Sequence, residues 1–161
     1  LNFLNLFLLR SGWKVFEEEK KMKVLVKKIN REARMPVYNH PGDAGLDIFS
    51  CQAMTIDPGE TAAVPTGLQL AIPFGYAGLL WDKSGLALRG IHCLAGVVDA
   101  GYRGEVKVVL TNLSQKPFVI TSGMKIAQML IQAIETPEPV EVDTLDETRR
   151  GEDGFGSTGL F

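Results

Sequence analysis

Hydrophobic and polar residues alternate in short runs along most of the chain, and Pro, Gly, Asp and Asn separate these runs. Successive side chains of a strand face opposite sides, so this pattern is typical of an all-β sandwich or barrel. We predict strands at residues 24–29, 46–51, 54–56, 61–65, 68–72, 77–81, 91–94, 96–99, 105–112, 118–120 and 127–133. Residues 140–145 can add one more strand after a break rich in proline.

One short helix is predicted between Asp82 and Gly90. Asp82 can cap its N-terminus, and Gly90 suits the left-handed conformation that ends many helices. The backbone amides of Lys83, Ser84 and Gly85 would then lie at the positive end of the helix, where anions bind readily.

The chain of 161 residues fits one domain, with segments of different character at its two ends. Met22 begins a strand-like run, so we expect natural translation to start there and residues 1–21 to be an extension outside the core; an amphipathic helix is the alternative. Residues 22–145 form the β domain. Residues 146–161 are rich in glycine, which makes ordering costly in entropy. They predict a flexible arm that closes only over a ligand offering many contacts.

Composition narrows the functional classes. Hydrophobic residues make up 45% of the chain, enough for a single core, and the net charge is −2 with dispersed lysines and arginines, which argues against nucleic-acid binding. Two cysteines without a CxxC spacing support neither a zinc site nor a disulfide framework, so a reducing cytoplasm is expected. The apolar residues 1–9 fall short of the roughly 20 that span a bilayer, so no membrane anchor is predicted.

The strongest candidate for chemistry is Asp99, which follows Val97 and Val98 where the chain is predicted to turn. A carboxylate held there by rigid strands can orient and deprotonate water, although aspartate also simply favours turns. Tyr102, three residues later, can pack its ring against a sugar, or it can be an ordinary aromatic residue of an edge strand.

Other polar residues can contact phosphate. Ser84 can donate to a phosphate oxygen or cap the helix, and Gln128 places an amide within an apolar strand. In the tail, an arginine can pair with phosphate, an aromatic ring can stack on a base and hydroxyls can donate; the alternative is a disordered end. These tail residues are Arg150, Phe155, Ser157 and Thr158.

Five segments, taken in order, resemble the five motifs of the homotrimeric dUTP diphosphatase (dUTPase) family. The segments are residues 44–48 (AGLDI), 82–87 (DKSGLA), 96–105 (GVVDAGYRGE), 123–128 (GMKIAQ) and 150–159 (RGEDGFGSTG). The resemblance covers nearly everything after Met22, and five ordered motifs are far more specific than any one of them.

The resemblance implies a distorted jelly-roll β-barrel that assembles as a homotrimer, with active sites at subunit interfaces and a C-terminal arm closing over each. It also implies the hydrolysis of dUTP to dUMP and pyrophosphate. Mg2+ would be held by the triphosphate and water rather than directly by side chains.

The resemblance also implies roles for single residues. Asp99 looks like the base that orients the attacking water, Tyr102 like the ring under deoxyribose, and Asp47 like structural support near the site. Uracil would be read by backbone groups of residues 93–99, including Cys93, Val97 and Val98, and near Lys107. Phosphate would be contacted by Lys83, Ser84, Gly85 and Gln128. The closing arm would contribute Arg150, Phe155, Gly156, Ser157 and Thr158.

The chain departs from the family pattern at several positions. The second motif commonly reads Pro-Arg-Ser, whereas Asp82 and Lys83 precede the serine here. Cys93 stands where many bacterial members have Asn, Lys125 replaces a usual Arg and Asp153 a usual Gly. These departures affect phosphate and uracil contacts rather than the reaction.

Two other functions remain open. A dCTP deaminase shares this fold, but its catalytic Glu matches Val109 here, so the proton carrier for deamination is missing. A non-catalytic nucleotide-binding module could lose Asp99 or the tail without penalty, yet the chain has both.

Overall fold

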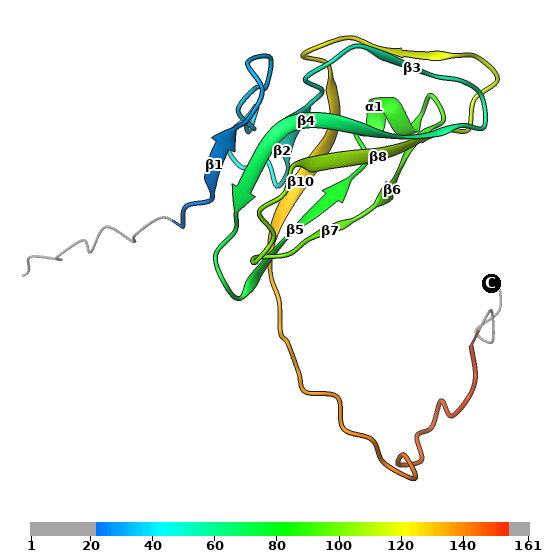
Figure 1. The fold of residues 1–161 in the computed structure, drawn as a ribbon. Helices are drawn as coiled ribbons and strands as arrows, with labels where there is room; N and C mark the ends of the chain where they lie inside the picture. The colour runs from blue at the N-terminus through cyan, green and yellow to red at the C-terminus, as the bar shows by residue number, and fades with distance from the viewer. Residues whose placement is uncertain (1–21, 155–161) are drawn as a thin grey trace, which may run out of the picture.

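The computed structural model of the protein describes residues 22–154, in which strands predominate and one short helix occurs (Figure 1). The predicted all-β class is confirmed. The elements are β1 (Leu25–Lys28), β2 (Leu46–Phe49), β3 (Met54–Ile56), β4 (Thr61–Ala71), β5 (Tyr76–Trp81), α1 (Ser84–Ala87), β6 (Ile91–Ala95), β7 (Val97–Val98), β8 (Val106–Asn112), β9 (Phe118–Ile120) and β10 (Lys125–Ala133).

Two four-stranded sheets enclose the core. The first has the order β1-β4-β8-β6, the second has the order β2-β10-β5-β7, and β3 pairs with β9 in a separate small sheet. Apolar side chains of both large sheets form one buried cluster that includes Ile48, Val64, Val108 and Met129. The jelly-roll prediction is confirmed, but the sheets do not close into a complete barrel, since β1, β6, β2 and β7 remain edge strands.

Strand β4 differs from its prediction, because the expected strands at residues 61–65 and 68–72 form one continuous element. Its register with β8 shifts between Pro65 and Leu68. Pro65 has no N–H to donate to the ladder, and Gly67 takes a left-handed φ of 67°. The irregularity therefore accommodates both residues without ending the strand.

Helix α1 confirms the prediction of a short helix, and Gly90 has the expected left-handed φ of 78°. The predicted N-cap is wrong. Lys83 occupies the cap position without a side-chain cap hydrogen bond, because the Asp82 carboxylate is bound to β6 instead.

The chain passes from the first sheet to the second between β6 and β7, and this crossing shapes the site. β6 pairs with β8 in the first sheet, whereas β7, only one residue later, pairs with β5 in the second. The register between β6 and β8 shifts between Cys93 and Ala95. β7 and β8 are joined by a turn, in which Tyr102 N–H donates to the Asp99 carbonyl at 3.1 Å, but they lie in different sheets. The two sheets therefore part at this turn.

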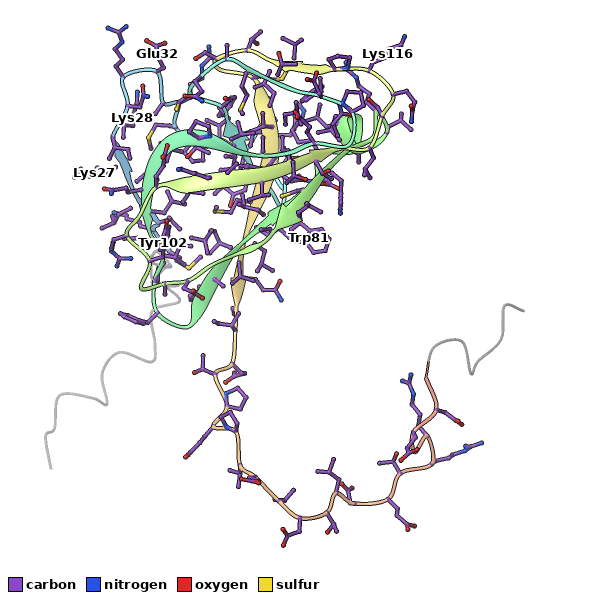
Figure 2. The ribbon with its side chains drawn as sticks, turned by 45° about the vertical axis from the view of Figure 1, so that its right-hand side comes forward. Lys27, Lys28, Glu32, Trp81, Tyr102 and Lys116 are labelled. Carbon is purple, nitrogen blue, oxygen red and sulfur yellow. The ribbon has the colours of Figure 1, made fainter. Side chains whose placement is uncertain are left out.

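After β10 the described chain leaves the body as an extended segment (Figures 1 and 2). The prediction of a strand at residues 140–145 is wrong, since no ladder forms there. The apolar side chains of Val140, Val142 and Leu145 are exposed and have no neighbouring strand to pack against. Within residues 22–154, no helix has the length and apolar character needed to cross a membrane.

Candidate active site

The predicted site residues of the domain gather mainly in two pockets that share no lining residue. The hairpin pocket, of about 560 Å³, lies at the turn between β7 and β8 and includes Val97, Val98, Asp99, Tyr102 and Lys107. The lysine pocket, of about 500 Å³, lies where β2, β10 and the end of β5 meet and includes Asp47, Lys83 and Gln128. Figure 2 labels one aromatic residue from each, Tyr102 and Trp81, and they lie apart on the surface.

The hairpin pocket presents an exposed carboxylate. Val98 is buried and anchors the end of β7 to Gly78 of β5, while the next residue, Asp99, is exposed. The Asp99 side chain makes no hydrogen bond or ion pair with any residue of the described chain. A carboxylate on a fixed backbone with free oxygen atoms is suited to hold a water molecule.

The ring of Tyr102 is positioned by its own turn. Its hydroxyl donates to the Glu105 carbonyl at 3.1 Å. A Cβ added to Gly104 would overlap the phenol ring, so only glycine lets the ring lie there. Arg103 closes the turn through Nη1, which donates to the Ala100 carbonyl at 2.6 Å. The ring therefore forms a fixed wall of the hairpin pocket.

Asp47 is the centre of the lysine pocket and is only 3% exposed. Its Oδ1 accepts from Lys83 Nζ at 2.5 Å, its Oδ2 lies 2.7 Å from Lys125 Nζ, and Asn39 also donates to it. Burial by itself would raise the pKa of Asp47, but the hydrogen bonds from Lys125, Lys83 and Asn39 outweigh it and lower the pKa. The carboxylate therefore stays charged.

Two lysines approach the lysine pocket and pair with Asp47, and Asp43 and Asp82 also line this pocket. Two ammonium groups share one carboxylate, and the side chains of Lys83 and Lys125 remain 28% and 38% exposed. Lys125 also donates to Asn39 Oδ1 at 2.7 Å. Exposed ammonium groups held in place by a buried carboxylate suit the binding of a multiply charged anion such as a phosphate chain.

Gln128 and Asp82 connect the lysine pocket to the neighbouring strands. Gln128 Nε2 donates to the Asp82 carbonyl at 2.8 Å, and its side chain lies over Gly45, where a Cβ would overlap it. The Asp82 carboxylate accepts from the Cys93 backbone N–H at 2.5 Å and lies 2.7 Å from His92 Nδ1. The side chain that was predicted to cap α1 thus binds strand β6.

The remaining predicted residues lie outside both pockets. Ser84 and Gly85 are exposed at the start of α1, next to Lys83. Cys93 lines a smaller pocket of about 190 Å³, and burial raises the pKa of its thiol. Arg150 lies on the extended arm, where Nε donates to the Asp153 carbonyl at 3.0 Å. Phe155, Gly156, Ser157 and Thr158 lie outside the described residues.

Sequence reasoning missed two partners of Asp47, which are Asn39 and Lys125. Asn39 lies in an irregular loop whose sequence has no signal for a partner of Asp47. Lys125 was noted only as a departure from the family pattern, whereas it binds the same carboxylate as Lys83. Two lysines at positions that usually hold arginine could have suggested a common partner, but their convergence depends on the fold.

The described residues offer few side-chain ligands for a directly bound metal ion. Among residues 22–154, no cluster of three or more His, Cys, Asp and Glu side chains could hold a metal ion. The one buried carboxylate of the lysine pocket is already bound to two ammonium groups.

Comparisons with known proteins agree with this geometry. The family described as dUTPase matches residues 31–159. A deoxyuridine 5'-triphosphate nucleotidohydrolase of Clostridium kluyveri is 50% identical over 143 residues, covering 87% of this chain and 100% of the relative. The solved structure of a Staphylococcus bacteriophage 80alpha dUTPase mutant with dUpNHpp has a TM-score of 0.82 at 31% identity and covers 87% of this chain and 100% of that one.

A second solved structure is a mutant dUTPase from phage phi11 of S. aureus, which reveals the coordination of a structural Mg(II) ion. It has a TM-score of 0.72 at 30% identity and covers 76% of this chain and 98% of that one. The family match and the curated relative both extend over most of the chain, including both pockets. This chain therefore belongs to the dUTPase family.

Proposed function

We propose that the protein hydrolyses dUTP to dUMP and pyrophosphate. The observation that carries the proposal is an exposed carboxylate, Asp99, fixed beside a positioned tyrosine ring in a pocket of about 560 Å³. The activity is that named for the Clostridium kluyveri relative, and the bacteriophage 80alpha structure with dUpNHpp supports a deoxyuridine nucleotide as ligand.

In the proposed reaction Asp99 orients a water molecule and accepts one of its protons. The water oxygen forms a bond to the α-phosphorus, and the bond from that phosphorus to the oxygen bridging to the β-phosphorus breaks. Pyrophosphate leaves with the bonding electron pair and the products are dUMP and pyrophosphate. Phosphoryl transfer of this kind depends mainly on positioning and charge stabilisation, which a fixed carboxylate and the ammonium groups of Lys83 and Lys125 can supply.

The nucleoside would occupy the hairpin pocket. Tyr102 would pack under deoxyribose, because its ring is held against Gly104 and its hydroxyl is bound to the Glu105 carbonyl. Backbone groups around Val97 and Val98, with Lys107 on the facing strand β8, would read uracil. The Cys93 N–H already donates to Asp82, so this amide would not bind uracil. Cys93 would support the uracil site only as part of strand β6.

The triphosphate would lie on the lysine pocket. Lys83 and Gln128 would contact phosphate oxygens, Ser84 and Gly85 at the start of α1 would add donors, and Asp47 would hold Lys83 in place. Mg2+, when bound by the triphosphate, would neutralise part of its negative charge.

A complete site would need more than one copy of the chain. Asp99 and Lys83 line different pockets of one protomer, and these pockets share no residue. Each pocket is lined by a large exposed apolar side chain, Val97 in the hairpin pocket and Trp81 in the lysine pocket. These features support a homotrimer in which the hairpin pocket of one copy faces the lysine pocket of another. The arm, with Arg150 and residues 155–158, would close over the bound nucleotide.

The test is pyrophosphate release from dUTP with Mg2+, followed by a mixing experiment. Asp99→Asn and Gln128→Ala chains, each impaired alone, are unfolded together and refolded together. If the site is shared, some mixed assemblies regain a site with intact Asp99 and intact Gln128, so activity returns. If each chain forms its own site, mixing restores nothing. Light scattering on the same samples measures the assembly.

The alternative functions are tested in the same assay. Deamination of dCTP requires a proton carrier at the position of Val109, which is a half-buried apolar residue of β8. We expect no uracil-containing product from dCTP. A non-catalytic nucleotide-binding module would bind dUpNHpp but release no pyrophosphate from dUTP.

A further inference from the structure

Asp82 makes side-chain contacts that a proline, the usual residue at this position in the family pattern, cannot make. The carboxylate of Asp82 is bound to β6 at two points, the Cys93 N–H at 2.5 Å and His92 Nδ1 at 2.7 Å. The backbone carbonyl of the same residue accepts from Gln128 Nε2 at 2.8 Å. One residue therefore contacts strand β6 with its side chain and a predicted phosphate ligand with its backbone.

The two sides of this link differ in rigidity. β6 is paired with β8 over several residues, and the free edge of β6 is where the Cys93 N–H meets the carboxylate. Asp82 and Lys83 lie between the end of β5 and the start of α1 and belong to no ladder. The paired strand is thus the anchor, and the unpaired segment is what the anchor holds.

Holding Asp82 in place fixes two predicted phosphate ligands at once. Gln128 depends on the Asp82 carbonyl and on the space over Gly45 for its orientation. Lys83 is the next residue, and its Nζ lies 2.5 Å from Asp47 Oδ1. This contact depends on the backbone conformation at Asp82. A negative side chain beside a phosphate pocket would otherwise weaken anion binding, but here both carboxylate oxygens face β6 rather than the pocket ligands.

We propose that Asp82 is a positioning residue that fixes Lys83 and Gln128 for the phosphate chain by anchoring their loop to the edge of β6. This inference rests on the proposed assignment of the phosphates to the lysine pocket. It differs from a merely structural role, because it predicts a loss confined to the phosphate part of the ligand.

The test uses the full chain with Asp82→Ala and Asp82→Asn. Asparagine keeps an acceptor for the Cys93 N–H and a donor for His92, but it removes the charge, whereas alanine removes both contacts. We expect Asp82→Ala to raise the KM for dUTP and the dissociation constant of inorganic pyrophosphate with Mg2+ about tenfold, with kcat within about twofold. Deoxyuridine, which has no phosphate, should inhibit with unchanged strength. Asp82→Asn should stay within about twofold of the wild type in all of these measurements.

Several outcomes would overturn the proposal. Equal pyrophosphate binding by the wild type and Asp82→Ala would do so, as would tighter binding by both variants, which would make Asp82 only a repulsive charge. A parallel loss of deoxyuridine binding would assign Asp82 a general structural role. If Asp82→Ala does not fold, His92→Ala removes one anchor from an exposed side chain, and a rise of about threefold in the pyrophosphate dissociation constant is expected.

Calorimetric titration with pyrophosphate separates this proposal from the proposed function. A wild type that binds pyrophosphate but does not hydrolyse dUTP would refute the reaction and still allow the role of Asp82 to be measured. A wild type that does not bind pyrophosphate would refute the phosphate assignment, and the positioning role with it.

Discussion

The two pockets hold their acidic residues in opposite ways. Asp47 in the lysine pocket is 3% exposed and is bound to Lys83, Lys125 and Asn39. Asp99 in the hairpin pocket is exposed and has no side-chain partner within the described chain. A carboxylate whose oxygen atoms are already bound organises its neighbours, while one with free oxygen atoms can meet water. This difference in environment supports the proposal that Asp47 organises its neighbours and that Asp99 is the base.

The strongest test of this comparison is Asp99→Asn. The amide keeps the size of the side chain but cannot accept a proton from water, so kcat for dUTP should fall about a thousandfold or more. Because the native side chain is exposed and makes no hydrogen bond or ion pair with described residues, the denaturant midpoint should not change. Pyrophosphate release and urea unfolding measure the two effects. An unchanged rate would show that Asp99 is not the base.

Truncation before Arg150 tests whether the two pockets support dUTP hydrolysis without the arm. If the arm closes over the nucleotide and excludes water, its removal should lower kcat/KM for dUTP about a hundredfold. The proposed trimer should persist, because Arg150 makes only local contacts with its own turn in the described chain. Light scattering and pyrophosphate release check this pair of outcomes. Full activity of the truncated chain would show that the pockets suffice without it.

Asp47→Asn should lower the stability of the fold, unlike Asp99→Asn. Removing the charge leaves the Lys83 and Lys125 ammonium groups facing each other, although both are partly exposed and therefore partly screened. We expect a loss of about 2 kcal/mol in the free energy of unfolding, measured by urea at equal protein concentration. A variant as stable as the wild type would show that the lysines do not depend on this carboxylate.

The same variant gives a pH test. The folded-state pKa of Asp47 lies below its ordinary value of 3.8, so the carboxylate contributes its full stability above that pH. The contribution is lost as the pH falls through the lowered folded-state pKa, when the native carboxyl also becomes protonated. The stability difference between wild type and Asp47→Asn should therefore shrink below about pH 4 and be constant near neutrality. Acid unfolding curves of both proteins measure it.

The smallest effect is expected for Gly104→Ala in the hairpin pocket. The added Cβ would overlap the ring of Tyr102, so the ring must turn away from its place beside Asp99. We expect the KM for dUTP to rise about tenfold, with a smaller change in kcat. Gly101→Ala is the matched control, because a Cβ there meets nothing within 4 Å. Equal effects of the two substitutions would contradict the role of the ring.

Some of the fold was readable from local patterns. Period-two alternation indicated most strands, and glycine at position 90 indicated the end of α1, because both depend on the conformation of a few consecutive residues. The strand predicted at residues 140–145 failed for the same reason: its alternation is real, but a strand also needs a neighbour, and the described chain supplies none. The break predicted between residues 65 and 68 failed because the ladder with β8 continues past the irregularity.

The chain by itself determined the strand-rich class, the short helix and the family motifs, and it made Asp99 the candidate for the base. Only the tertiary structure decided that the site residues divide between two pockets, that Lys83 and Lys125 meet at Asp47, and that Asp82 binds β6. Lys83 and Asp47 are 36 positions apart, and Lys125 and Asn39 are 86 apart. Such contacts depend on sheet order, register and the change of sheet at β7, which no local pattern encodes, because a side chain meets a distant partner only after the strands have paired.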